Sequence, residues 1–537
     1  MFSETPTCEH NMKIKRNKQK NNPTTRKDVK KMNMKKLISM VLALVMLLAM
    51  SATAFAEDTS AETYEITAPD NGHTYEVYQI FTGDLITENN QRVLTNVKWG
   101  KNGTGTEGNL VEQTVLDAIE AVNVAGKSDA EKLAVIKVYA NLNKDNAFGT
   151  VTNANALDNV PAGYYLIKDV DGAFENQNDS YTTYIVKIVT DVTITPKADA
   201  PEFVKKVDDK NDSNNSEDDV EWEDSADYDI GDEVLFKLEA TLPSNFDAYS
   251  SYKLVFHDKQ TAGLTFNASS VKVYIGSSTN PISAGYRVVT NPTDGCTFEV
   301  VFDNLKDVND DGTPVIADLD NSSVIRVEYT ATLNSNAVLG AAGNPNIAYI
   351  NFSNNPNYDG TGVEPMGKTP EDKVTVFTYS VVVNKVDQDN NPLAGAKFTL
   401  YKKNAQGTYV VVGAEKVTTT GEDGNVLTWT GLDDGDYKLV EIAPTGYNSI
   451  NDIYFTITAE HEILSNDPQL TALNGGNLVT GEFKDTGVIT TNIVNQKGAT
   501  LPETGAQGTK MIYMVGGILV AAAAILLITK RRMNAAE

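Results

Sequence analysis

Two apolar segments lie at opposite ends of the 537-residue chain, and they indicate in which cellular compartment the sequence between them folds. Lys35 and Lys36 precede a nearly uninterrupted apolar run over residues 37–50, and small residues follow up to Ala56. This order of charge, apolar run and small residues is typical of a secretory signal peptide rather than of a buried core helix. We expect cleavage directly after Ala56.

The cysteines support the same division of the chain. Residues 1–31 are polar and basic, and they place the charged region of the signal unusually far from the start, so we expect translation to begin at Met32 or Met34. Cys8 would then be absent, and Cys296 would be the only thiol of the secreted chain. An intrachain disulfide is therefore excluded.

The second apolar segment is a 19-residue stretch over residues 511–529. As a helix it would span roughly 28 Å of hydrocarbon at about 1.5 Å per residue. The basic residues 530–532 follow at once and would be cytoplasmic by the positive-inside rule. Directly before the span stands the pentapeptide Leu501, Pro502, Glu503, Thr504 and Gly505. A permanently membrane-anchored ectodomain is the simpler alternative for this end.

The charge of the secreted part is strongly negative. The whole chain has 72 acidic and 45 basic residues, a net charge of −27. The two terminal segments hold 15 of the basic and 4 of the acidic residues, which leaves 30 basic and 68 acidic residues in 57–504. Such an excess argues against nucleic acid or anionic lipid as a partner. With 41% hydrophobic and 22% charged residues the composition is that of an ordinary globular protein.

Residues 57–197 mix strand and helix patterns and form the first predicted domain. Residues 74–81 and 181–189 are typical of strands. Apolar residues from Val111 to Val122 recur at helical spacing, and Ser128 with Glu131 forms a capping box before a second helix.

The rest of the secreted chain shows β patterning only. Turn clusters at residues 243–245, 280–281 and 343–345 punctuate the second predicted domain, 198–373, and a third runs over 374–500. Short strands and frequent turns are typical of immunoglobulin-like β-sandwiches. We therefore predict a mostly β chain of tandem immunoglobulin-like β-sandwich domains, with helices inserted in the first. Residues 501–537 form the C-terminal signal and membrane helix.

Several motifs together resemble a known family. The LPETG pentapeptide, apolar span and basic tail resemble the cell-wall sorting signal of Gram-positive surface proteins. Six further segments resemble sortase-assembled backbone pilins whose domains form internal isopeptide bonds: residues 75–84, 94–100, 228–232, 329–334, 385–387 and 392–396. The resemblance covers essentially all of the secreted chain and implies that the protein is the repeating shaft subunit of a pilus.

The resemblance also implies how subunits are joined. A sortase cysteine would attack the carbonyl of Thr504, release Gly505 onward and hold the chain as a thioester. In the family, a lysine after a Tyr-Pro or Thr-Pro step attacks the thioester of another subunit. Lys197 follows Pro196 here, and because proline stops the strand, this amine is expected at the domain edge.

In the second domain, strand phase selects two polar residues that share a face with apolar neighbours. Lys205 is in phase with Phe203 and Val207, and Asn346 is in phase with Ala348 and other apolar residues of its strand. The resemblance implies an isopeptide bond between Lys205 and Asn346, and the alternative is that these polar groups are only strand-end residues at the surface. The resemblance places the proton-shuttling acid of this site at Asp258.

In the third domain, Lys385 on the first strand and Glu441 are the candidate nucleophile and proton shuttle. Burial lowers the pKa of a lysine and raises that of a carboxyl, so a protonated Glu441 could polarise an asparagine amide for attack and loss of ammonia. Strand phase leaves both Asn495 and Asn492 open as the partner, and family position points to Asn495. In the first domain, residues 163–169 resemble the strand that carries Glu441 but have no glutamate at the corresponding position. We therefore expect no isopeptide bond in this domain.

One acidic loop matches the oxygen spacing of a calcium site. The candidates are Asp307, Asn309, Asp311 and Asp318, but the expected final glutamate is an aspartate, and no flanking helices are apparent. An acidic surface hairpin is the simpler interpretation, and no metal or other cofactor is predicted. No Ser/His/Asp set, phosphate loop or zinc pattern indicates catalysis on an external substrate.

The sequence thus predicts an extracellular, wall-anchored structural subunit whose precursor passes through the cell membrane. Its expected partners are a pilus-type sortase, a housekeeping sortase, identical subunits, minor pilins and peptidoglycan. A singly anchored adhesin or minor pilin is the alternative, since it needs the sorting signal but not Lys197. A wall-associated hydrolase is disfavoured because no paired-carboxylate or nucleophile motif is present.

Overall fold

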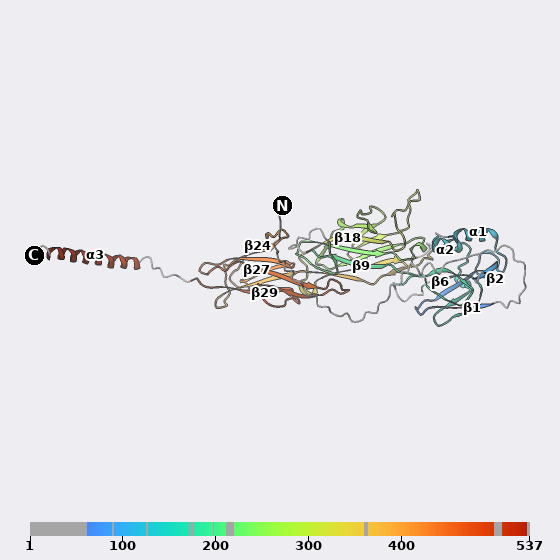
Figure 1. The fold of residues 1–537 in the computed structure, drawn as a ribbon, viewed down its shortest axis with the longest axis horizontal. Helices are drawn as coiled ribbons and strands as arrows, with labels where there is room; N and C mark the ends of the chain where they lie inside the picture. The colour runs from blue at the N-terminus through green and yellow to red at the C-terminus, as the bar shows by residue number, and fades with distance from the viewer. Residues whose placement is uncertain are drawn as a thin grey trace, which may run out of the picture. The chain divides into compact units, whose positions relative to one another are not determined.

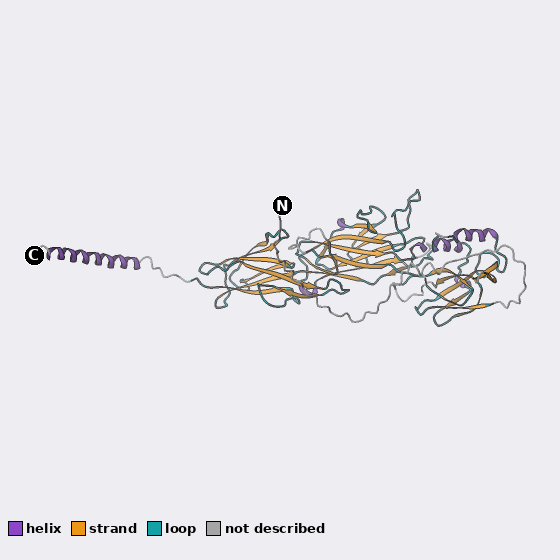
Figure 2. Cartoon of the chain, in the orientation of Figure 1, coloured by secondary structure: helices purple, strands orange, loops and turns teal. Residues whose placement is uncertain are grey.

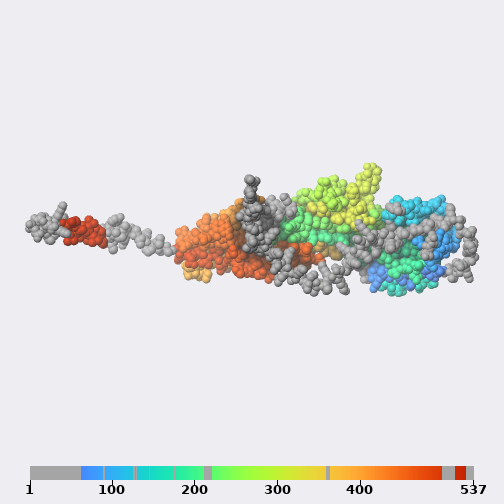
Figure 3. Space-filling model, viewed as in Figure 1, coloured from blue at the N-terminus to red at the C-terminus, as the bar shows by residue number. Residues whose placement is uncertain are grey.

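The computed structural model describes residues 62–498 and 507–533, apart from 89–90, 125–126, 171, 173–176, 197, 211–219 and 359–362. Strands dominate these residues, and the described α-helices lie within residues 113–137 and 507–533 (Figures 1 and 2). In the space-filling view, which is coloured by residue number, residues close in sequence form contiguous patches of similar colour (Figure 3). The mostly β fold predicted from the sequence is confirmed.

The first module contains two sheets and two helices. One sheet has the strand order β5-β1-β8, and the other has the order β3-β2-β6-β7 with β4 beside β2. The strands are β1 (Thr63–Thr67), β2 (Tyr75–Glu88), β3 (Gln91–Trp99), β4 (Gly149–Val151), β5 (Leu157–Pro161), β6 (Gly163–Asp169), β7 (Thr183–Ile188) and β8 (Val192–Thr193).

The two predicted helices of this module are present. Helix α1 (Gln113–Val122) buries Leu116 and Ile119, as the helical spacing of its apolar residues predicts. Helix α2 (Asp129–Lys137) begins with the predicted capping box. The Ser128 hydroxyl accepts a hydrogen bond from the backbone N–H of Glu131, and the Glu131 carboxylate accepts one from the backbone N–H of Ser128.

The middle module is a sandwich of two sheets. Their strand orders are β10-β9-β12-β18-β14, with β15 beside β18, and β11-β21-β19-β13-β17-β16, with β20 beside β19. The strands are β9 (Glu202–Asp208), β10 (Trp222–Glu223), β11 (Ser225–Asp227), β12 (Glu233–Thr241), β13 (Leu254–Gln260), β14 (Leu264–Phe266), β15 (Lys272–Ile275), β16 (Arg287–Thr290), β17 (Phe298–Phe302), β18 (Val324–Leu333), β19 (Asn344–Ser353), β20 (Met366–Lys368) and β21 (Asp372–Phe377).

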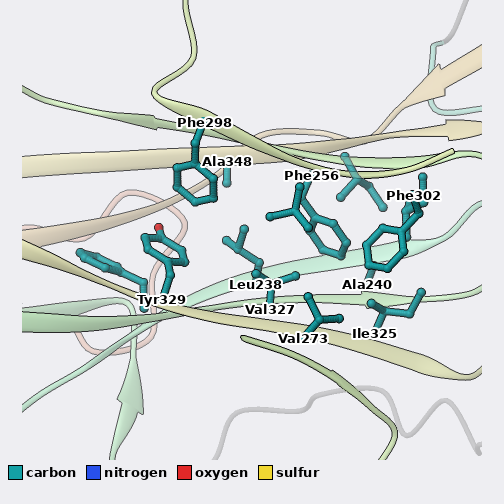
Figure 4. Packing of buried hydrophobic residues seen from close by; sticks show 14 of the residues in the cluster. Leu238, Ala240, Phe256, Val273, Phe298, Phe302, Ile325, Val327, Tyr329 and Ala348 are labelled. Carbon is teal, nitrogen blue, oxygen red and sulfur yellow. The ribbon is translucent and has the colours of Figure 1, made fainter. Parts of the chain in front are cut away.

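Alternate residues of both sheets meet in one apolar core. In β12 and β18 every second residue is buried, as expected for strands with one face on a core. Leu238 and Val327 from one sheet pack with Phe256, Phe302 and Ala348 from the other (Figure 4). Burial of apolar surface on this scale supplies the main favourable free energy of folding.

The third module is a second sandwich, with sheets of order β25-β22-β29 and β24-β23-β26-β27-β28. Its first and last strands, β22 and β29, run parallel side by side. The strands are β22 (Tyr379–Asp387), β23 (Lys397–Lys403), β24 (Tyr409–Val417), β25 (Val426–Leu432), β26 (Gly435–Ile442), β27 (Ile453–His461), β28 (Leu470–Asn474) and β29 (Val488–Asn495).

Two details differ from the sequence prediction. Strand β21 pairs with β11 and β19 of the middle module up to Phe377, so the expected boundary at residue 373 falls inside a strand. The turn expected at residues 343–345 ends at Gly343, whose φ is 51°, and β19 begins at Asn344. The Asn344 side chain bonds to the backbone of Val338 and Val376, which stabilises an extended conformation where Asn-Pro usually turns.

The C-terminal apolar stretch lies in helix α3 (Gln507–Met533), whose side chains are described over residues 514–527. Among the described residues no helix is long and apolar enough to cross a membrane. The predicted signal peptide, with its cleavage point at Ala56, lies outside the described residues.

Candidate functional site

The middle module buries a lysine, an aspartate and an asparagine together between its sheets. Lys205 comes from β9 in one sheet, whereas Asp258 and Asn346 come from β13 and β19 in the other. All three residues are completely buried. The structure thus brings together the three residues that the sequence singled out in this module.

A tyrosine hydroxyl connects these three side chains. Tyr329 of β18 accepts hydrogen bonds from Lys205 Nζ at 2.9 Å and from Asn346 Nδ2 at 2.9 Å. It donates its own proton to Asp258 Oδ2 at 2.6 Å, and Lys205 Nζ lies 2.5 Å from the same oxygen. One donor and two acceptor positions are all that a phenol offers, so the hydroxyl is fully used.

The surroundings of Lys205 act on the protonation of its amine in opposite directions. Burial lowers the pKa of Lys205, and the Asp258 carboxylate opposes that shift. The ring centroids of Phe236 and Tyr329 lie 5.3 and 5.5 Å from Nζ, and such contacts favour the protonated amine. Phe298 packs against Tyr329 (Figure 4). A lysine amine becomes a nucleophile only when it has lost its proton, which an apolar site promotes.

Two oxygens of the site lack a hydrogen bond. Asn346 Oδ1 and Asp258 Oδ1 are buried and have no hydrogen-bond partner among the described residues. An unpaired buried acceptor costs free energy, on the order of 1–3 kcal/mol.

The third module has a corresponding arrangement on different strands. Lys385 of β22 and Asn495 of β29 lie on neighbouring parallel strands, and Glu441 of β26 reaches them from the facing sheet. The side chains of Lys385 and Glu441 have no exposed surface, and Asn495 is fully buried. These residues too are the ones that the sequence singled out.

The contacts in this module place the carboxyl between the amine and the amide. Asn495 Nδ2 donates to Glu441 Oε2 at 2.9 Å and to the backbone oxygen of Asn448 at 2.8 Å. Lys385 Nζ lies 3.8 Å from Glu441 Oε1 and donates to the backbone oxygens of Val386 and Ile493. Burial lowers the pKa of Lys385, against the effect of Glu441. Glu441 Oε1 and Asn495 Oδ1 accept no hydrogen bond from a described residue.

Asn492, the other asparagine left open by strand phase, points away from this site. It is exposed, and its Oδ1 accepts a hydrogen bond from Asn384 Nδ2 at 3.1 Å. The geometry favours Asn495 over Asn492 as the partner of Lys385.

The first module buries a lysine and a carboxylate without repeating this arrangement. Glu76 of β2 and Lys168 of β6 are directly opposite each other, with Nζ and Oε2 3.2 Å apart. The Tyr78 hydroxyl donates to the same Glu76 oxygen at 2.6 Å. The buried charges thus form an ion pair, and the absence of an isopeptide bond in this module stays a prediction.

The residues expected to join subunits lie outside the described part of the chain. These are Lys197 and the pentapeptide 501–505. Before Lys197, β8 ends at Thr193, and the backbone N–H of Ile194 donates to the oxygen of Thr67 at 2.8 Å. Thr195 is exposed, which is consistent with a chain that leaves the sheet at this point.

The candidate calcium loop forms a hairpin in which Asp311 Oδ1 accepts hydrogen bonds from the backbone and hydroxyl of Thr313. Among the described side chains, two other groups hold donor atoms close enough for a metal ion. One consists of His257, Asp294 and Cys296, and the other consists of Asp209, Asp227 and His461.

Two family models match the chain. A model of the SpaA prealbumin-like fold domain matches residues 379–468, which is most of the third module. A model of the LPXTG cell wall anchor motif matches residues 493–535. The second match agrees with the cell-wall sorting signal that the sequence predicts at this end of the chain.

Similarity to a curated protein extends over almost the whole length. The chain is 24% identical to the trypsin-resistant surface T6 protein of Streptococcus pyogenes serotype M6, over 92% of this chain and 98% of that protein. Among solved structures, the T6 backbone pilin of serotype M6 Streptococcus pyogenes is 18% identical, with a TM-score of 0.46 over 81% of this chain and 98% of that one. The major pilin SpaD of Corynebacterium diphtheriae is also 18% identical, with a TM-score of 0.43 over 81% and 97%.

Tyr329 is the site residue that sequence reasoning did not assign. Its strand alternates strictly, so the phase of Tyr329 with Val327 and Ala331 indicates an inward side chain. A tyrosine hydroxyl in an apolar core needs a hydrogen-bond partner. The inward phase of Tyr329 therefore indicated that a polar group lies next to its hydroxyl.

Proposed function

We propose that this protein is the shaft subunit of a covalently polymerised pilus on a Gram-positive cell wall. The observation that carries the proposal is the cell-wall anchor at residues 493–535 on a chain whose middle and third modules each bury a lysine, a carboxyl and an asparagine together. The similarity to the T6 protein over 92% of the chain supports it.

The linking reaction uses the anchor and one lysine. A sortase cysteine attacks the Thr504 carbonyl, the Thr504–Gly505 amide breaks, and the chain is held as a thioester. The Lys197 amine of another subunit then attacks this thioester, an amide forms, and the sortase thiol is released. A pilus-type sortase would repeat this step along the shaft, and a housekeeping sortase would transfer the finished polymer to peptidoglycan.

Intramolecular isopeptide bonds would stabilise each subunit. Lys205 attacks the side-chain carbonyl of Asn346, an amide forms, and one ammonia leaves. Asp258 takes the proton from the amine and returns one to the departing nitrogen. Lys385, Asn495 and Glu441 carry out the same exchange in the third module. Neither step needs a cofactor, because the amide nitrogen leaves as ammonia.

The placement of the bonds suits a fibre under tension. The Lys205–Asn346 bond would join the two sheets of the middle module, and the Lys385–Asn495 bond would join the first and last strands of the third. A permanent cross-link acts like a disulfide by restricting the unfolded chain, yet it cannot be reduced. The signal peptide and the C-terminal apolar stretch would serve only the precursor.

Cell-wall extracts boiled in detergent test the proposal. An antibody against this chain should detect a ladder of high-mass species, since amide links between subunits survive denaturation. The Lys197→Ala variant should reach the surface as monomer only. A single band from wild-type cells that express a pilus-type sortase would instead support a singly anchored adhesin.

A further inference from the structure

Four side chains with metal-binding donor atoms meet on the outer face of the middle module. His257 lies on β13, where its neighbours Phe256 and Asp258 both face the core, so alternation turns His257 outward. In the strand register His257 is directly opposite Glu299 of β17 and Tyr349 of β19. Three adjacent hydrogen-bonded strands thus give the imidazole a rigid platform.

The loop before β17 adds two further donors. The backbone N–H of Asn291 donates to Thr297 O at 2.9 Å, and that of Thr297 donates to Asp258 O at 2.7 Å, so the loop closes onto β13. Within it the Asp294 carboxylate caps the backbone N–H of Cys296 at 3.0 Å. Cys296 is only 8% exposed, so its thiol lies against the sheet rather than in solvent.

The distances between the donor atoms suit a single cation. His257 Nδ1 lies 2.8 Å from Asp294 Oδ2 and 3.4 Å from Glu299 Oε1. One nitrogen, one sulfur and one oxygen, from His257, Cys296 and Asp294, all lie within 4.8 Å of one another. In a tetrahedral zinc site with bonds of about 2.0–2.3 Å, ligand atoms are roughly 3.3–3.8 Å apart. Small rotations of these side chains would reach that spacing.

We infer that His257, Asp294 and Cys296 form a zinc-binding site, with Glu299 as the fourth ligand. The mixed donor set selects the metal: a thiolate disfavours Ca²⁺ and Mg²⁺, whereas imidazole, thiolate and carboxylate together suit Zn²⁺. On binding, the Cys296 proton passes to solvent, and His257 binds as the neutral imidazole. Because its ligands come from both elements, the bound ion fixes the loop that carries Asp294 and Cys296 to strand β13.

The position of this site on β13 gives it a structural role. His257 precedes Asp258, whose carboxylate lies on the opposite face of the strand in the buried Lys205 site. A metal ion that fixes the loop and the strand would therefore steady the backbone that carries Asp258. The zinc site rests on its own donor atoms and stands whether or not the chain is polymerised.

Zinc and cobalt titrations of residues 57–504, freed of metal with a chelator, test the inference. One Zn²⁺ per chain should bind, and Co²⁺ in its place should give the near-ultraviolet absorption of a cobalt–thiolate bond. Cys296→Ser should abolish that absorption, and both Cys296→Ser and His257→Gln should weaken zinc binding more than about tenfold. Circular dichroism establishes that each variant is folded.

The matched control is His461→Gln, which alters the other group of potential ligands. It should leave zinc stoichiometry and the cobalt spectrum unchanged. Loss of the ion in this variant would assign zinc to the other group and overturn the inference. Absence of stoichiometric zinc from the wild-type chain, or zinc binding that survives both Cys296→Ser and His257→Gln, would overturn it as well.

Discussion

Lys205 and Asp258 approach within 2.5 Å, Nζ to Oδ2, although they come from opposite sheets of the middle module and neither has exposed surface. Two buried charges are costly even as a pair, because their desolvation can exceed their attraction. In the isopeptide reaction that we propose, the Lys205 amine becomes part of a neutral amide, which would remove one of the two buried charges.

Intact-mass measurement of residues 57–504 should show a deficit of two ammonia molecules. Each deficit reports one internal amide, at Lys205–Asn346 and at Lys385–Asn495. Lys205→Ala and Lys385→Ala should each restore one ammonia, and the double variant should restore both. A full, unmodified mass for the wild-type chain would refute the hypothesis of internal isopeptide bonds.

Glu441→Ala should restore one ammonia and destabilise the third module, because Asn495 loses the carboxyl that contacts its amide. By analogy with a lost disulfide, the unfolding free energy should fall by about 2–5 kcal/mol. Calorimetry measures the change. Glu460→Ala, at an exposed position of the same module, should leave mass and stability nearly unaltered. Equal losses in both variants would show that the effect is not specific to the site.

Tyr329→Phe should slow or prevent the bond in the middle module. The substitution removes the hydroxyl that holds Lys205, Asp258 and Asn346 together while it keeps the aromatic ring. Mass spectrometry during refolding should detect the uncrosslinked chain. Tyr252→Phe is the matched control, since Tyr252 is fully buried in the same core and its hydroxyl has no partner among the described residues. Identical kinetics in the two variants would rule out a role for the Tyr329 hydroxyl.

Stability should fall as pH rises from about 4 to 7, in part because of Asp227. Burial, with the nearby Asp209 carboxylate, raises the pKa of Asp227 to about 7, while Lys402 opposes the shift. The folded chain then keeps a proton that the unfolded chain loses near its ordinary pKa. Each such proton lowers the unfolding free energy by about 1.4 kcal/mol per pH unit across that window. Burial lowers the pKa of His461 to about 4, which acts in the opposite direction.

Asp227→Asn removes this proton and should flatten the decline in denaturant midpoints measured between pH 4 and 7. The exposed Glu422→Gln serves as its control and should keep the wild-type slope. A wild-type slope in Asp227→Asn would mean that Asp227 keeps an ordinary pKa.

Strand periodicity selected Lys205 and Asn346 in the middle module, whereas Asp258 came from the family resemblance, because its strand β13 is buried on both faces. The phase of Lys205 and Asn346 with apolar neighbours could be read directly. It could not separate Asn495 from Asn492, because both faces of β29 carry Ile, Val and Thr residues. The difference lies in the facing sheet, where Glu441 meets Asn495, and strand phase within β29 contains no information about that contact.

Other features depended on tertiary contacts that no local pattern encodes. The end of the middle module at Phe377 follows from the pairing of β21 with β11, a strand about 150 residues earlier. Tyr329 could be placed in the core from its phase, but its bonds to three side chains from three other strands could not. The grouping of His257 with Cys296 likewise arises from strand register and loop closure.

The covalent link between subunits is the central claim, and peptide sequencing of purified polymer tests it most directly. Tandem mass spectrometry of a protease digest should find a branched peptide in which the carbonyl of Thr504 is joined to Nζ of Lys197. Lys197→Arg should abolish this peptide, because a guanidinium stays protonated and cannot attack the thioester. Polymer in which Thr504 is joined to a different lysine, or wall material in which Thr504 is found only on peptidoglycan, would contradict the account.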